Sequence, residues 1–151
     1  MKKIIGLVIT CLILLTSCNT GNLSSDKTGE SLNAVVEIKD RMFISQTNDI
    51  YLNTEDYVGR TIKYEGVFDI YQPEPNGKAY NLVVRYGPGC CGNDGTVGFE
   101  VAWDGDYPEQ NDWVEVMGEP AFYEEDGAKY LYLNLSSLTV LAERGLENVT
   151  Q

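Results

Sequence analysis

The feature that most restricts the fold of this chain is an alternation of apolar and polar residues between residues 61 and 141. A period of two residues is typical of β-strands that bury one face. Segments rich in Gly, Pro, Asn and Asp interrupt the alternation, as turns do. The pattern predicts five strands, over residues 61–71, 80–86, 97–103, 112–123 and 130–141.

Two of these strands contain a glycine where a curling strand would bend. Gly66 ends the run TIKYEG, and Gly118 ends the run DWVEVMG. Glycine permits the curvature that a closed sheet requires, and both runs resemble the first and fourth strands of OB-folds. We therefore expect a mainly β domain over residues 34–141, a small five-stranded OB-like barrel. An immunoglobulin-like sandwich, which has about seven strands, is the alternative.

One N-terminal helix precedes the strands in this interpretation. Apolar residues recur at helical spacing over about residues 41–52, after a short opening strand at residues 35–38. The residues on the predicted helix face are Phe43, Ile44, Thr47, Ile50 and Tyr51. At the other end, residues 142–151 form a polar tail that we expect to fray.

The strand beginning at residue 112 makes the clearest prediction about facing. Val114 and Val116 fall on one face of this strand, and Trp113 falls on the other. We expect the valine face to point into the core and the Trp113 face to be solvated.

The first eighteen residues have the organisation of a bacterial export signal. Two lysines precede an almost wholly apolar run over residues 4–15, which is too short to cross a bilayer but suits a signal peptide. The sequence Leu15-Thr16-Ser17-Cys18 resembles the lipobox of bacterial lipoproteins. The resemblance implies a lipoprotein signal peptide over residues 1–17, a lipid such as palmitate on Cys18, and a flexible tether over residues 18–33. The alternative is an ordinary secreted protein in which Cys18 is incidental.

The charge of the chain limits the classes of partner that it can bind and the ways in which it can attach to a membrane. A net charge of -12 argues against nucleic acid, because phosphate recognition depends on clustered Lys and Arg. An anionic leaflet would also repel this domain, so the lipid is the expected membrane attachment. The predicted location is the extracytoplasmic face of the cell membrane or envelope.

The chain has no His, which removes the usual general base and the commonest zinc ligand, and we expect no enzyme activity.

Aromatic residues are frequent along the predicted strands. On an OB-like face they could stack single-stranded bases. The acidic charge favours core packing and strand propensity as the explanation instead. The residues concerned are Tyr64, Phe68, Tyr71, Tyr80, Tyr86, Tyr123, Tyr130 and Tyr132.

The glycine-rich segment 87–95, predicted as a loop after the second strand, contains the candidate metal ligands Cys90, Cys91 and Asp94. Adjacent cysteines place their Cα atoms about 3.8 Å apart, closer than disulfides normally span, so a bond between them would be strained. Two thiolates and a carboxylate suit zinc or Cu(I), although zinc ligands are usually spaced more widely and include His. Burial of the thiols as small apolar groups, a simple disulfide and redox chemistry remain open.

Several segments recur in the same order in a known family. They are Phe43-Ile44, Ile50-Tyr51, Asn53 with Tyr57-Val58-Gly59, Ile62-x-Tyr64-x-Gly66, Leu82-Val83-Val84-Arg85-Tyr86, Cys90-Cys91-x-x-Asp94 and Trp113-Val114-x-Val116-x-Gly118. They resemble the C-terminal extracytoplasmic domain of the YcgQ-like bacterial membrane proteins, over about residues 36–141. That family is paired with a predicted permease, so the resemblance implies a permease or another envelope protein as a partner. This chain differs in using a predicted lipid anchor.

These observations predict a membrane-anchored, extracytoplasmic binding or accessory module that is not an enzyme. Its expected ligand is a thiophilic metal, or it assists a transport partner. Two alternatives stay open: a thiol redox protein that uses the adjacent cysteine pair, and a purely structural envelope lipoprotein.

Overall fold

The computed structural model describes residues 34–90 and 92–150. The predicted signal peptide, the tether, Cys18 and Cys91 therefore lie outside the described residues. The elements in chain order are β1 (Val35–Glu37), the 3-10 turn η1 (Asp40–Met42), α1 (Phe43–Leu52), the 3-10 turn η2 (Thr54–Asp56), β2 (Thr61–Tyr71), β3 (Tyr80–Gly89), β4 (Gly92–Ala102), β5 (Trp113–Glu125) and β6 (Ala128–Val140).

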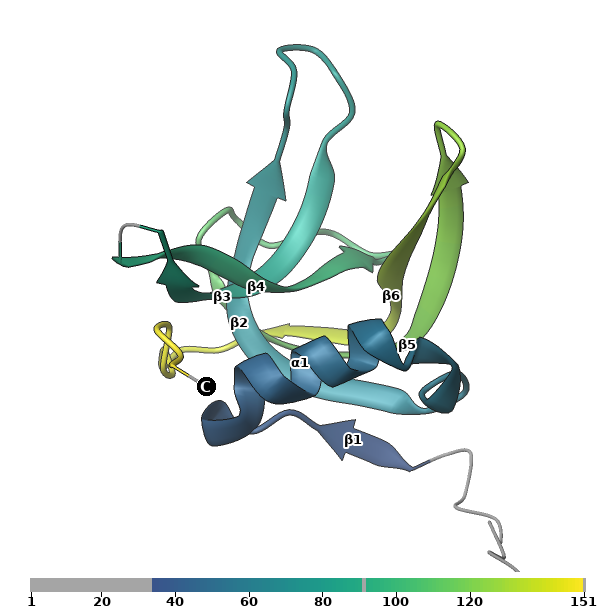
Figure 1. The fold of residues 1–151 in the computed structure, drawn as a ribbon. Helices are drawn as coiled ribbons and strands as arrows, with labels where there is room; N and C mark the ends of the chain where they lie inside the picture. The colour runs from purple at the N-terminus through teal and green to yellow at the C-terminus, as the bar shows by residue number, and fades with distance from the viewer. Residues whose placement is uncertain (1–33, 91, 151) are drawn as a thin grey trace, which may run out of the picture.

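The strands form one mixed sheet, and the prediction of a mainly β fold with one N-terminal helix is confirmed (Figure 1). The strand order is β1-β2-β3-β4-β6-β5, and β2 also pairs with β5. Pairing is antiparallel except between β1 and β2 and between β4 and β6. The sheet has six strands rather than the five predicted for the barrel, because the opening strand predicted at residues 35–38 forms as β1 and joins the edge of β2 in parallel.

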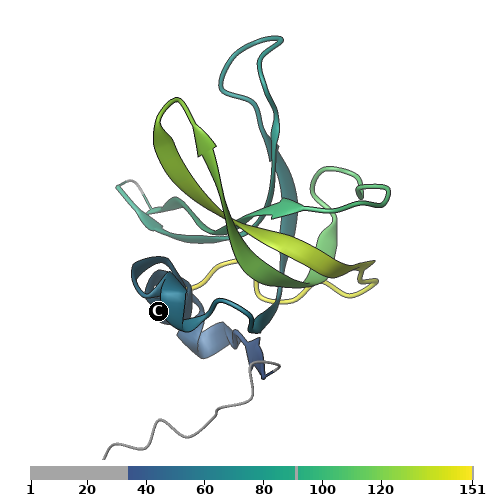
Figure 2. The same cartoon turned by 90° about the vertical axis from the view of Figure 1, so that its right-hand side faces the viewer.

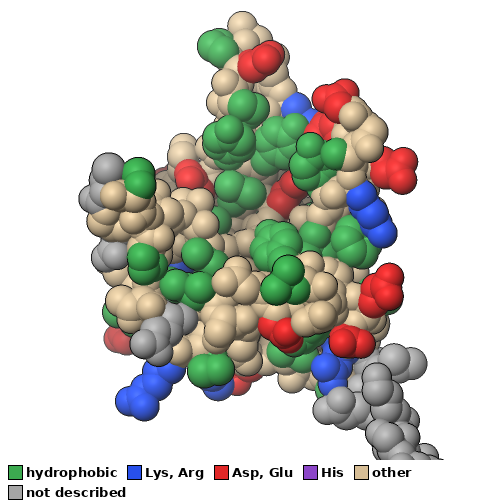
Figure 3. Space-filling view, viewed as in Figure 1, with side chains coloured by type: hydrophobic (Ala, Val, Ile, Leu, Met, Phe, Trp, Pro, Cys, Tyr) green, Lys and Arg blue, Asp and Glu red, His purple; other side chains and the backbone are tan. Residues whose placement is uncertain are grey.

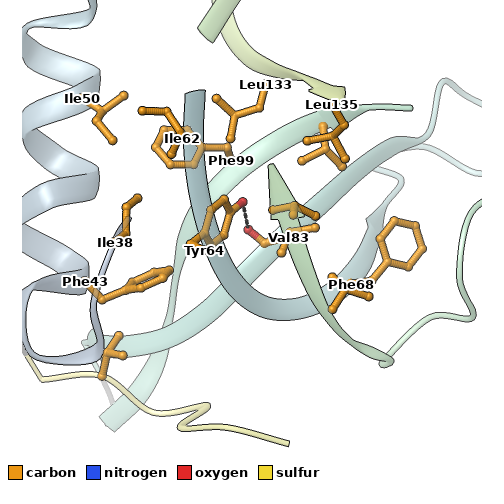
Figure 4. Close-up of a cluster of buried hydrophobic side chains, with 14 residues drawn as sticks. Ile38, Phe43, Ile50, Ile62, Tyr64, Phe68, Val83, Phe99, Leu133 and Leu135 are labelled. Carbon is orange, nitrogen blue, oxygen red and sulfur yellow. Dashed lines mark hydrogen bonds between the residues drawn. The ribbon is translucent and has the colours of Figure 1, made fainter. Parts of the chain in front are cut away.

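The core lies inside the curved sheet and is covered at one end by α1 (Figures 1 and 4). The helix face predicted from the sequence supplies Phe43, Thr47 and Ile50, all buried. The buried Tyr64 ring lies edge-on to Phe43, and its hydroxyl donates a hydrogen bond to the Val83 carbonyl at 2.8 Å. This bond satisfies the one polar atom that the tyrosine side chain brings into the core.

The prediction of which side chains of β5 are buried is half right. Val114 and Val116 are fully buried in the core, as expected. Trp113 is also buried, at 3% exposure, so the prediction of a solvated face was wrong. Its indole N–H donates to the Glu65 carboxylate at 3.1 Å, and the ring lies 5.2 Å from the Arg85 guanidinium. The alternation rule assumes that one face meets water, and here other parts of the chain cover that face.

The C-terminal segment is one of the parts that cover it, and the prediction that residues 142–151 fray was wrong for the described part. Val149 is 1% exposed and belongs to the core cluster. Its N–H donates to the Tyr86 carbonyl, while the Tyr86 N–H donates to the Glu147 carbonyl, both at 2.8 Å. The segment therefore runs beside β3 as an additional bridge (yellow in Figures 1 and 2).

The glycine-rich segment 87–95, predicted as a loop, is instead the end of a hairpin. β3 continues to Gly89, and β4 begins at Gly92. Gly89 pairs with Gly92 after a register shift between Gly87 and Gly89. Glycine here permits a narrow hairpin with an irregular end, which composition alone does not distinguish from an open loop.

Candidate functional site

The first candidate site is the tip of the β3–β4 hairpin, which projects sideways from the sheet (Figure 1). Cys90 and Asp94 are both exposed, and the Cys90 Sγ atom lies 3.7 Å from Asp94 Oδ2. The structure thus brings two of the three predicted ligands together, whereas Cys91 lies outside the described residues. Burial as a small apolar group does not apply to Cys90, because its side chain faces solvent. Among the described residues alone, no cluster of three or more His, Cys, Asp or Glu side chains forms.

Glycine at position 89 leaves room for Asp94 and for the backbone of Gly95 on the opposite strand. A Cβ atom on Gly89 would lie 1.9 Å from Asp94 Oδ1, far inside van der Waals contact. The aspartate carboxylate therefore lies across the backbone of the opposite strand, on the space that a side chain at residue 89 would fill. This arrangement holds the carboxylate beside the Cys90 thiol.

The second candidate site is a cleft between two other hairpins. The β2–β3 and β5–β6 hairpins project from the same end of the sheet (Figures 1 and 2). A cleft of about 510 Å³ lies between them, and hydrophobic side chains gather in this hollow (Figure 3). Four aromatic rings and two aliphatic side chains contribute to the lining: Tyr51, Phe99, Phe122, Tyr130, Leu82 and Val84. Tyr51 stacks on Phe99 with ring centroids 5.1 Å apart.

The aromatic residues of this region were assigned to core packing from the sequence, and that interpretation is only partly right. Tyr64 and Phe68 are indeed buried. Tyr71 and Tyr130, in contrast, are 56% and 44% exposed. The hairpins extend beyond the core, so alternation continues where there is no interior left to fill.

A polar network connects the two hairpins across the cleft. Lys78, in the β2–β3 connection, forms an ion pair with Glu125 of β5 at 2.8 Å, and the Tyr80 hydroxyl donates to the same carboxylate at 2.8 Å. Glu100, which lines the cleft, accepts a hydrogen bond on its Oε2 atom from the Tyr123 hydroxyl at 2.7 Å. No sequence motif indicates a role for Glu100. A polar residue between Phe99 and Val101 is the only sign of it, and such a residue fits any outward-facing strand position.

The environment of the cleft favours neutral tyrosines. Burial and, secondly, the negative charge of Glu100 raise the pKa of Tyr51 to about 12. Burial and the hydrogen bond to Glu100 raise the pKa of Tyr123. In the core below, burial raises the pKa of Tyr64 far above its ordinary value.

The domain is therefore expected to lose stability in alkali. The pKa values of Tyr51, Tyr64 and Tyr123 exceed the value of about 10 for tyrosine in an unfolded chain. The stabilisation from these neutral hydroxyls is complete below pH ~10 and disappears as the pH rises toward the folded-state pKa values. Tyrosinate absorbance and circular dichroism recorded in one titration measure both events. Ionisation of every tyrosine near pH ~10 with the fold intact would contradict the expectation.

A buried arginine that no sequence pattern indicates connects several elements around the core. Arg85 is 2% exposed and lies between the rings of Phe43 and Trp113, at 4.6 Å and 5.2 Å. Its Nη1 atom pairs with the Asp40 carboxylate at 2.5 Å, and its Nε–H donates to the Glu65 carbonyl at 2.7 Å. Through these contacts Arg85 joins η1, β2 and β5.

Comparisons with known proteins identify a family. The model of the DUF1980 C-terminal domain family matches residues 18–143. Searches of curated proteins and of solved structures found no match. No helix in the described part of the chain has the length and apolar character needed to cross a membrane.

Proposed function

This chain belongs to the DUF1980 C-terminal domain family, and within that family we propose that it acts as a non-enzymatic binding module on the extracytoplasmic face of a membrane. A lipid on Cys18 tethers the domain, and the tip of the β3–β4 hairpin binds a thiophilic metal ion. The resemblance to the YcgQ-like proteins, which are paired with a predicted permease, supports a transport protein as the partner of this module.

The frame of the module is an OB-like barrel in this proposal. The pairings β2–β3, β3–β4, β4–β6, β6–β5 and β5–β2 form a continuous ring, and a ring of five strands with a parallel pair between its third and fifth members supports that assignment. β1 and the C-terminal segment are additions at its periphery. A closed frame of this kind holds the hairpins at fixed positions.

The observation that carries the metal proposal is the approach of Cys90 to Asp94. Their side chains lie 3.7 Å apart at an exposed position, as ligands of one ion must, and the next residue along from Cys90 is a second cysteine. Thiolates favour soft ions, so zinc and Cu(I) are the expected metals. A carboxylate adds a harder ligand that zinc also accepts.

Metal uptake by the reduced domain tests this proposal. A soluble protein lacking residues 1–18 is expected to bind zinc or Cu(I), with affinity falling as the pH drops because protons compete for the thiolates. Cys90→Ser or Cys91→Ser should abolish binding, and Asp94→Asn should weaken it about tenfold, equivalent to about 1.4 kcal/mol. Elemental analysis and a competitive metal titration measure these effects.

A further variant keeps all three candidate ligands. Gly89→Ala should weaken binding at least as much as Asp94→Asn, since the added methyl group would lie 1.9 Å from the Asp94 carboxylate and 2.8 Å from the backbone nitrogen of Gly95. Equal metal uptake by the wild type and by the Cys90→Ser, Cys91→Ser double variant would contradict the proposed metal site. If thiol titration then shows two thiols only after reduction, the redox alternative takes its place.

The tether is tested by Cys18→Ser. Because Leu15-Thr16-Ser17-Cys18 resembles a lipobox, this change should prevent lipidation and move the protein from the membrane fraction to the soluble fraction. Immunoblots of fractionated cells, with metabolic labelling by a fatty acid, measure the shift. Equal membrane association of wild type and variant would show that Cys18 is not the attachment point.

A further inference from the structure

The cleft between the β2–β3 and β5–β6 hairpins combines aromatic walls with one carboxylate. Its volume of about 510 Å³ lies within the range of sites for small molecules, about 300–1,000 Å³. The rings of Tyr51, Phe122 and Tyr130 border it, and Glu100 contributes the acidic group among the described residues that line it. Such a lining suits a ligand with an apolar body and a positive charge.

The aromatic faces here already hold positive charges from the chain itself. The Lys129 ammonium lies 3.8 Å from the centroid of the Phe122 ring. Outside the lining of the cleft, the Lys78 ammonium lies 4.6 Å from the centroids of both Tyr80 and Tyr123. Within the cleft, the Phe122 ring is oriented so that a cation can rest on its face, where the ring quadrupole attracts it.

The Glu100 carboxylate has a fixed position and can still form an ionic contact with a ligand. The Tyr123 hydroxyl donates to one of its two carboxylate oxygens at 2.7 Å and thereby fixes the position of the side chain. A carboxylate accepts several hydrogen bonds, so this bond leaves capacity for a further donor. Glu100 is half-buried, where a charge-assisted hydrogen bond is stronger than at the surface.

The surroundings add to the attraction for a cation. A second hollow adjoins the cleft at Tyr51 and Phe122, and Glu55 and Asp56 line it. The whole chain has a net charge of -12, which steers cations toward its surface. Lys129 opposes this field, but it is exposed and lies on a flexible side chain that can leave the Phe122 face.

We propose that this cleft binds a small organic monocation, with the ammonium group on the Glu100 carboxylate and the apolar body against Tyr51, Phe122 and Tyr130. The ligand replaces the Lys129 ammonium on the Phe122 ring. The site is separate from the cysteine tip, and its occupancy does not require a metal.

Calorimetric titration of the full-length chain in a non-ionic detergent tests the proposal with three probes that share one ring. Tyramine carries an ammonium group, tyrosol is its neutral alcohol analogue, and 4-hydroxyphenylacetate is anionic. Tyramine should bind at least tenfold more tightly than tyrosol, and 4-hydroxyphenylacetate should not bind. Equal affinity for tyramine and tyrosol, or tighter binding of the anion, would overturn the proposal.

Three variants assign the binding to the cleft. Glu100→Gln preserves an acceptor for Tyr123 and should weaken tyramine binding about tenfold, while Glu119→Gln, the same change at an exposed site on β5 outside the cleft, should leave it unchanged. Lys129→Met should strengthen binding severalfold, because it removes a competing positive charge. Weaker binding in Lys129→Met would show that the cleft recognises a negative group, and equal losses in Glu100→Gln and Glu119→Gln would show that only overall charge matters.

Discussion

Val116→Asp should unfold the domain. Val116 is fully buried and belongs to the core cluster inside the sheet. It pairs with Tyr64 of β2 on one side and with Leu138 of β6 on the other. A carboxylate at this position would have no partner, and burying it costs several kcal/mol, which is comparable with the ~5–15 kcal/mol by which a domain of this size is stable. Circular dichroism during thermal unfolding measures the loss.

The same substitution on the neighbouring strand provides the control. Val140 of β6 is 52% exposed and pairs with Val114 of β5, so Val140→Asp should change the melting temperature only slightly. Trp113→Asp should also be severe, because that side chain is buried against Arg85. A melting temperature for Val116→Asp equal to that of Val140→Asp would contradict the placement of Val116 in the core.

Gly98→Ala is the second substitution with a large expected effect. A Cβ atom on Gly98 would lie 2.1 Å from the Val83 carbonyl oxygen and 2.8 Å from the Val84 Cα atom. Both obstacles are backbone atoms of the paired strand β3 and cannot rotate away. The strands would have to separate, so a destabilisation of about 3 kcal/mol or more is expected. Urea unfolding at equilibrium measures this difference.

Gly87→Ala is the matched control on the same hairpin. A Cβ atom there would meet only ordinary contacts, 3.4 Å from side-chain atoms of Ile44 and Val97. We expect a change below about 1 kcal/mol. If Gly98→Ala is tolerated as well as Gly87→Ala, then β3 and β4 do not approach each other at residue 98 as closely as the structure shows.

The sequence predicts the central parts of the strands well, because one face of each strand meets the core. The run over residues 61–71 matches β2 (Thr61–Tyr71) at both ends. The predicted helix face also supplies the buried residues of α1. In both elements one face meets the core, and this single fact explains both the hydrophobic period and the burial. The sequence pattern is therefore sufficient to predict which residues are buried.

Errors occur where a residue is buried by a distant segment. Trp113 is covered by Arg85 and by the C-terminal segment, where a side chain on Gly145 would collide with the indole ring. Asp40 meets Arg85 across 45 positions of the chain. No local pattern contains these partners, and polar residues such as Arg85 count as exposed in any hydrophobic period.

The two candidate sites also differ in how far they could be predicted from the sequence. The approach of Cys90 to Asp94 was predictable, because four residues at a hairpin tip cannot separate far. The cleft was not, because Tyr51, Glu100 and Tyr130 come from three elements far apart in the sequence. Only the ring of strand pairings brings them to one end of the domain.

The docking of Val149 has a consequence for how the protein is made. Residues near Val149 complete the hydrogen bonding of Tyr86 and close the core near Ile44 and Gly87. The segment that contains Val149 must therefore be synthesised before the native interior can close. Until that moment the nascent polypeptide exposes apolar side chains, which is the condition in which chaperones recognise a chain. A recombinant protein shortened at residue 141, where the alternation ends, would lack this last closing piece.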